Sequence, residues 1–123
     1  MKLSLDTDSS AYVIRAYRRG ELVINEQTVT RSVVVLPQRL IGDWPPQRFE
    51  ELAMEHVETV VALAPEIILL GTGGRARLPS ARLAAAVLRR DIGLEAMDTA
   101  AACRTFNVLA SEGRRVAAAL MMI

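Results

Sequence analysis

Short β-rich runs separated by turn signals occupy the first third of the chain. Apolar and β-branched residues gather at 11–17 and again at 22–24, and Arg18-Arg19-Gly20 between them is a typical turn sequence. Two such runs around a short turn predict a β-hairpin. Residues 28–36 are β-branched almost throughout and stop at Pro37, which predicts a third strand.

Helical and extended patterns alternate along the remaining two thirds. After Pro45-Pro46, apolar residues recur at helical spacing as far as Pro65, with glutamates on the other side, which predicts a helix. The same reasoning predicts strands at 67–70, 94–97 and 116–122, and helices at 79–90 and 98–111. Because strands that alternate with helices at short spacing form a partly parallel sheet, the order β-β-β-α-β-α-β-α-β predicts a two- or three-layer α/β fold.

The ends of two predicted strands carry the first group of candidate binding residues. Gly71, Thr72 and Gly73 open the loop after strand 67–70, and Asp98 and Thr99 follow strand 94–97. If these strands are parallel neighbours, both groups lie at the edge where open α/β sheets bind ligands. Glycines there allow close backbone approach, and the free N–H groups of such a loop can receive an anion. A tight turn without a binding role is the alternative, because the loop lacks the P-loop and dinucleotide patterns.

Helix 98–111 adds two further candidates, Arg104 and Asn107, which share one stripe of its surface. We expect the guanidinium of Arg104 to reach back over the glycine loop. There it either ties the loop to Asp98 or presents a bidentate donor to a carboxylate or phosphate. Cys103 lies on the apolar stripe of the same helix beside Phe106, so we expect a structural thiol rather than a catalytic one.

Charge and cysteine content exclude several classes of function. The formal net charge is +1, which argues against non-specific nucleic-acid binding. The chain has one cysteine and one histidine, far apart in sequence, so we expect no Cys–His dyad, no zinc site and no cofactor. No apolar run of about 18 residues suggests a transmembrane segment, and the first ten residues lack a signal-peptide pattern. These features predict a cytoplasmic protein.

Four stretches within residues 65–120 resemble the Mth938-like family of small α/β proteins. They read PEIILLGTG (65–73), GLEAMDT (93–99), AACRTFNVL (101–109) and EGRRVAAAL (112–120). The resemblance implies one domain over residues 1–123, with a three-layer α/β fold, a central mixed sheet and an N-terminal β-hairpin region. It supplies no catalytic residues. A mitochondrial relative in that family acts with partner proteins during the assembly of respiratory complex I.

Two hypotheses about function follow. The first is a non-catalytic protein-binding module of a bacterial cell, similar to an assembly factor, because no catalytic constellation is present. The second is a small-molecule (anion) binding protein or an enzyme that uses the strand-end cleft formed by residues 71–74 and 98–104. Both use the same edge, and neither identifies a partner or substrate.

Overall fold

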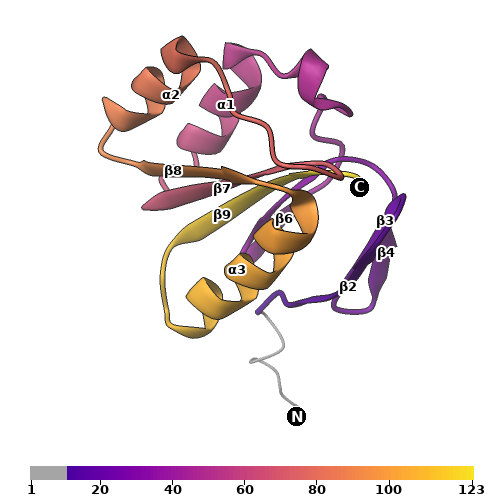
Figure 1. The fold of residues 1–123 in the computed structure, drawn as a ribbon. Helices are drawn as coiled ribbons and strands as arrows, with labels where there is room; N and C mark the ends of the chain where they lie inside the picture. The colour runs from indigo at the N-terminus through magenta and orange to yellow at the C-terminus, as the bar shows by residue number, and fades with distance from the viewer. Residues whose placement is uncertain (1–10) are drawn as a thin grey trace.

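A five-stranded mixed sheet forms the middle layer of the computed structural model, which describes residues 11–123 (Figure 1). The strand order is β6-β5-β9-β7-β8. Strands β8, β7 and β9 run parallel, whereas β5 is antiparallel to both β9 and β6. The strands are β5 (Val33–Leu36), β6 (Arg39–Ile41), β7 (Ile67–Thr72), β8 (Gly93–Met97) and β9 (Val116–Met121). The expected central mixed sheet is thus confirmed.

Different elements cover the two faces of this sheet, which confirms the three-layer architecture. Helices α1 (Met54–Val61) and α2 (Ala81–Leu88) lie on one face (Figure 1). On the other face lie helix α3 (Thr99–Ser111) and a small antiparallel sheet. That sheet consists of β2 (Ile14–Arg18), β3 (Glu21–Ile24) and β4 (Gln27–Val29), and its β2–β3 pair is the predicted N-terminal hairpin.

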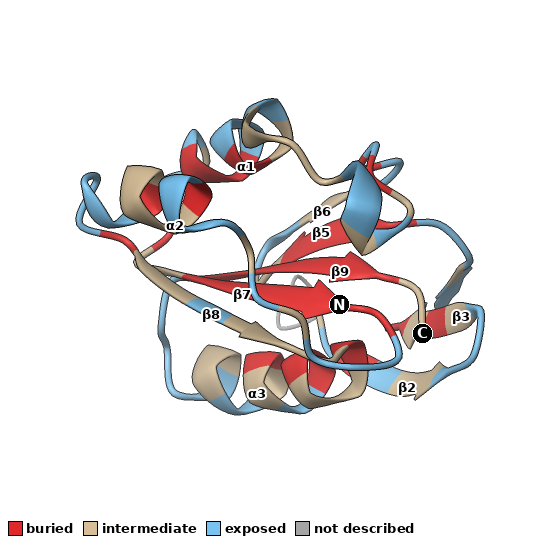
Figure 2. Ribbon diagram, turned by 45° about the horizontal axis from the view of Figure 1, so that its top comes forward, coloured by how far each residue is buried: buried red, intermediate tan, exposed pale blue. Residues whose placement is uncertain are grey.

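Strand β9 joins the two halves of the hydrophobic core. All six of its residues are buried, as the uninterrupted red ribbon of Figure 2 shows. Val116, Ala118 and Leu120 pack towards α3 and the small sheet, whereas the alternate residues pack towards α1 and α2. Alternation along a strand directs successive side chains to opposite faces, so one short segment supplies both cores.

The strand predicted at residues 28–36 is wrong as a single element. The chain leaves β4 after Val29 and begins β5 at Val33, in a different sheet. Ser32 turns the chain between them: its N–H donates to the Gln47 side chain at 3.1 Å, and its carbonyl accepts from Trp44 N–H at 3.0 Å. Strand β6 was not predicted, because Pro37 was interpreted only as a strand end.

The helix predicted from Pro45-Pro46 begins much later, at Met54. A short 3₁₀ turn, Phe49–Glu51, lies within the intervening segment. The Gln47 amide donates to the carbonyls of Trp44 and Pro45, at 2.9 and 3.1 Å, and so holds this segment outside an α-helix. Helix α3, in contrast, begins where its sequence predicts, because the Asp98 carboxylate accepts from Ala101 N–H at 2.9 Å.

Helices α1, α2 and α3 are each too short to cross a bilayer, and no other helix among residues 11–123 is long and apolar enough to do so. The expectation that the first ten residues are not a signal peptide concerns a segment outside the described residues.

Candidate functional site

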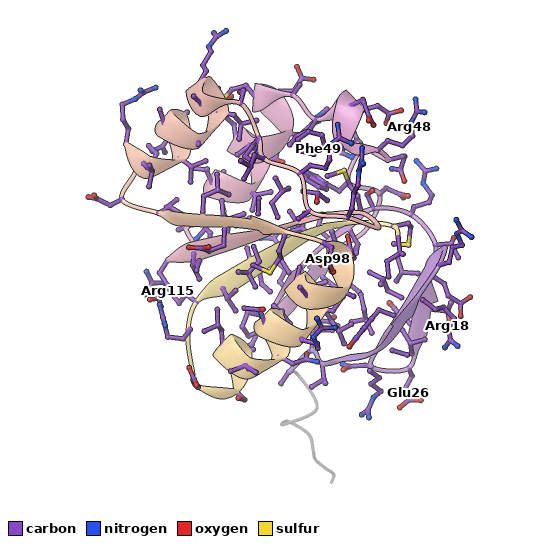
Figure 3. All side chains as sticks on the ribbon, in the orientation of Figure 1. Arg18, Glu26, Arg48, Phe49, Asp98 and Arg115 are labelled. Carbon is purple, nitrogen blue, oxygen red and sulfur yellow. The ribbon has the colours of Figure 1, made fainter. Side chains whose placement is uncertain are left out.

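The carboxyl ends of β7 and β8 lie side by side, as the sequence predicts. The two strands are parallel neighbours, with Gly71 opposite Met97. The loop after β7 and the first turn of α3 therefore meet at one edge of the sheet. Figure 3 labels Asp98 at the start of α3, and Arg48 and Phe49 on the segment before α1.

Thr99 is the central contact of this edge. Its buried hydroxyl accepts from Gly73 N–H at 2.8 Å and donates to the Met121 carbonyl at 2.6 Å. The Gly73 carbonyl in turn accepts from Thr99 N–H at 2.9 Å. One side chain thus ties together the loop after β7, the end of β9 and the start of α3.

Gly71 is required for this close approach. A Cβ at residue 71 would lie 2.9 Å from Leu120 Cδ2 and 3.0 Å from Thr99 Oγ1, closer than side chains pack. Gly73 takes a positive φ of 102°, which favours glycine. Both glycines have the backbone roles expected for them.

The loop uses some of its own hydrogen-bond donors internally. Gly73 N–H donates to Thr99, and Arg77 N–H donates to the Thr72 hydroxyl at 3.1 Å. The same hydroxyl lies 2.7 Å from the Arg75 carbonyl. Our expectation that free N–H groups of this loop receive an anion is therefore not met at residues 73 and 77.

Arg104 and Asn107 lie away from this edge, against the small sheet. The Arg104 guanidinium lies over the Tyr17 ring, 5.9 Å from its centroid and 3.3 Å from its hydroxyl, instead of over the glycine loop. The Asn107 amide accepts from Ile14 N–H at 2.9 Å and donates to the Ile14 carbonyl at 2.8 Å. Both residues contact β2, and they lie further along α3 than Asp98 and Thr99. Gly71, Thr72, Gly73, Asp98 and Thr99 come together, whereas Arg104 and Asn107 form a separate contact.

A pocket of about 420 Å³ opens beside the loop and contains residues that the sequence did not reveal. The Arg77 guanidinium lies 4.7 Å above the Phe49 ring and forms an ion pair with Glu50 at 3.2 Å. Arg48 pairs with Glu51 at 3.6 Å, whereas exposed Arg75 has no carboxylate within 4.0 Å among residues 11–123. Arginines therefore dominate the rim.

Cys103 and His56 occupy structural positions. Burial raises the pKa of the Cys103 thiol to about 12, which keeps it protonated at neutral pH. His56 Nδ1 accepts from Ala53 N–H at 3.0 Å at the start of α1, and its ring meets Trp44 edge-on. Within the part of the chain that the structure describes, no three His, Cys, Asp or Glu side chains gather as metal ligands.

Comparison with known proteins places the chain among relatives of similar fold. Residues 14–121 match a family model described as "Protein of unknown function (DUF498/DUF598)". An NADH dehydrogenase [ubiquinone] 1 alpha subcomplex assembly factor 3 from Danio rerio is 35% identical over 115 residues, which are 92% of this chain. The chain spans 66% of that relative's length, slightly less than two thirds. A Francisella tularensis protein named "13 kDa major membrane protein" is 29% identical over 94% of this chain and 95% of its own.

Solved structures agree with the fold. A Xanthomonas campestris protein is 45% identical and superposes with a TM-score of 0.84, over 99% of this chain and 92% of its own. A Bordetella pertussis protein described as a Mth938-like domain is 30% identical, with a TM-score of 0.83, over 98% of this chain and 92% of its own. These likenesses confirm the resemblance on which the fold prediction was based.

Proposed function

The chain belongs to the DUF498/DUF598 family of proteins of unknown function, and from this membership we propose that it is a non-catalytic, assembly-factor-like module that binds a partner protein in a bacterial cell. It acts as one Mth938-like domain over residues 1–123. The name of the zebrafish relative, an assembly factor, supports this class of function. The geometry supports it too, since the one cysteine is buried and the one histidine is engaged at the start of a helix.

The proposed binding surface is the strand-end edge. The observation that carries it is the contrast between a fixed frame and an exposed cationic rim. Gly71, Thr72, Gly73, Asp98 and Thr99 form the frame through contacts that use their polar atoms within the protein. Outside that frame, the exposed guanidinium of Arg75 has no ion pair among residues 11–123 and remains available to a partner's carboxylate.

Arg104 and Asn107 extend the proposed surface along α3, away from the edge. Asn107 fixes β2 against the helix, and the exposed Arg104 guanidinium on Tyr17 presents a flat cationic group there. An arginine that is stacked on an aromatic ring still has N–H groups that can donate to a carboxylate. Because its side chain is already ordered, it loses little further entropy when it binds.

Affinity purification from the native host, with mass spectrometry, tests this proposal. Arg75→Glu reverses an exposed charge that has no ion pair among residues 11–123, so it should abolish partner recovery without changing the melting temperature. Arg89→Glu makes the same charge reversal at an exposed position on the far end of α2 and should leave recovery unchanged. Equal recovery with both variants, or no reproducible partner, would overturn the proposal.

A second candidate function is the binding of a small anion in the 420 Å³ pocket, which the arginines of its rim favour. A thermal-shift panel of inorganic phosphate, nucleotides and carboxylates separates the two. Stabilisation by one of these compounds that is lost in Arg75→Ala would favour the anion. No response to the panel, with a partner recovered from the host, would favour protein binding.

We also propose that the protein works in the cytoplasm. The described helices contain no membrane-spanning candidate, although the Francisella relative is named a membrane protein. Fractionation of the native host, with detection of the chain in the cytosolic fraction, checks this location. Recovery in the membrane fraction would contradict it.

A further inference from the structure

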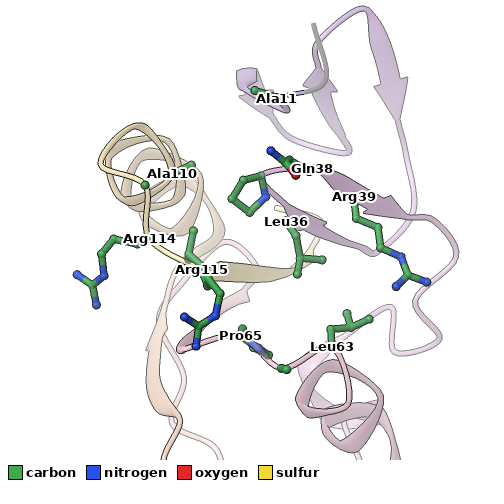
Figure 4. Close-up of a pocket in the computed structure, with 13 residues that line it drawn as sticks. Ala11, Leu36, Gln38, Arg39, Leu63, Pro65, Ala110, Arg114 and Arg115 are labelled. Carbon is green, nitrogen blue, oxygen red and sulfur yellow. The ribbon is translucent and has the colours of Figure 1, made fainter. Parts of the chain in front are cut away.

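A second and larger pocket, of about 490 Å³, lies at the opposite end of the sheet from the glycine loop (Figure 4). Four chain segments form it where β7 and β9 begin. They are Ala11 before β2, the turn between β5 and β6, the chain between α1 and β7, and the end of α3 with the turn that leads into β9. Neither proposed function uses this pocket.

The floor of the pocket is apolar. Leu36 and Leu63 are half-buried and present accessible apolar surface there, whereas Pro65 and Val116, which also line the pocket, are buried. Gly113 lines the pocket at the α3–β9 turn. Its positive φ of 80° is a backbone conformation that favours glycine. An apolar surface of this kind attracts an aliphatic side chain from outside the molecule.

The charged residues that line the pocket are all arginines: Arg39, Arg114 and Arg115. Arg114 is neutralised by Glu66, whose carboxylate lies 3.0 Å from its guanidinium. The other carboxylate oxygen of Glu66 accepts from Arg115 N–H at 3.0 Å. The guanidinium groups of Arg39 and Arg115 have no carboxylate within 4.0 Å among residues 11–123, so two positive charges flank an apolar floor without a partner there.

We propose that this pocket binds an extended acidic segment of a partner protein, with an apolar side chain on the floor and carboxylates on both sides of it. Figure 4 shows Arg39 extending from one side of the pocket and Arg115 from the other. Acidic residues on both sides of an apolar residue in an extended chain would offer one carboxylate to each arginine, because each residue adds about 3.3 Å.

This surface lies apart from the glycine edge, so the inference goes beyond the proposed function and shares with it only the general class of protein binding. The charge arrangement also predicts a salt-dependent affinity, because both arginines are exposed. Two exposed charge contacts should contribute about two- to thirtyfold to the affinity.

Titration of the ¹⁵N-labelled full chain with the blocked peptide Glu-Glu-Leu-Leu-Glu-Glu tests the inference. The amide signals of Ala64, Gly113 and Val116 should shift saturably, and the shifts should weaken as salt is added. Arg39→Gln/Arg115→Gln should weaken binding about fivefold, within the range given by two exposed charge contacts. Arg82→Gln/Arg89→Gln, which removes the same charge at two exposed positions on and next to α2, should not weaken it.

Three results would overturn the inference. The first is equal binding of the neutral peptide Gln-Gln-Leu-Leu-Gln-Gln. The second is a set of shifts confined to the glycine loop at residues 71–74, which would favour the proposed edge instead. The third is saturation of the same amides by sodium octanoate at equal affinity, which would assign the pocket to a single amphipathic anion. Partner recovery with Arg75→Glu tests the strand-end edge and not this pocket. Either proposal can therefore be refuted while the other stands.

Discussion

Replacing Thr99 with valine should cost far more stability than its size suggests. Valine keeps the shape of the side chain but removes the hydroxyl that joins Gly73 N–H, at 2.8 Å, to the Met121 carbonyl, at 2.6 Å. Both hydrogen bonds are buried, so water does not replace the lost partner. An orphaned buried polar group costs about 1–3 kcal/mol, so two of them predict a loss of about 2–6 kcal/mol. For a chain of this length that corresponds to a melting temperature lower by about 8–24 °C.

Urea unfolding followed by circular dichroism measures this loss through the transition midpoint at constant slope. Thr105→Val is the matched control on the same helix. Its hydroxyl donates to the Ala101 carbonyl, which belongs to the helix ladder, so its removal should cost less than about 1 kcal/mol. Thr99→Ser keeps the hydroxyl and should lose only about 1 kcal/mol. If Thr99→Val is no more destabilising than Thr105→Val, the hydroxyl does not hold the edge together.

Three further predictions concern single residues. Gly71→Ala should destabilise the protein by about 1–3 kcal/mol in urea unfolding, since its Cβ would meet Leu120 and Thr99; unchanged stability would show that α3 moves aside freely. Cys103, with its pKa raised to about 12 by burial, should react with a thiol reagent at pH 8 only after the chain opens; rapid labelling of the native protein would contradict this. Hydrogen bonding from Arg115 N–H, more than any other cause, lowers the pKa of Glu66. The ionised Glu66 carboxylate therefore stabilises the fold at neutral pH, and this stabilisation is lost as the pH falls through the lowered pKa. The stability gap between wild type and Glu66→Gln should accordingly close in acid, and a gap that widens would refute the assignment.

Local patterns predicted the second half of the fold well. The apolar run at 67–70 became β7, and Asp98 begins α3 because one side chain satisfies an N–H of the first turn. The first half depended on contacts between distant residues. The break between β4 and β5 was not visible, because β-branched residues continue to its edge and Ser32 is held by Trp44 and Gln47 from a later segment.

The sequence predicts which backbone segments come together at the candidate site. It does not predict the directions of the side chains there. Parallel neighbours bring Gly71 and Thr99 to one edge, which follows from the element order alone. The direction of Arg104 did not follow, because Tyr17, on which it lies, is 87 residues away. The Arg77–Phe49 contact also joins distant segments, and the segment that carries Phe49 had been assigned to a helix.

The position of β9 bears on how the protein is made. The β5–β6 pair and the β7–β8 pair have no strand pairing with each other except through β9, the last strand in chain order. Nascent chains emerge from the ribosome in sequence order, so both pairs leave the tunnel before the strand that unites them. Until residues 116–121 appear, β5 and β7 each present an unpaired apolar edge to solvent, the kind of surface that chaperones recognise and that aggregates form around. The central sheet is therefore completed only after β9 has been made, in a single step that closes both cores together.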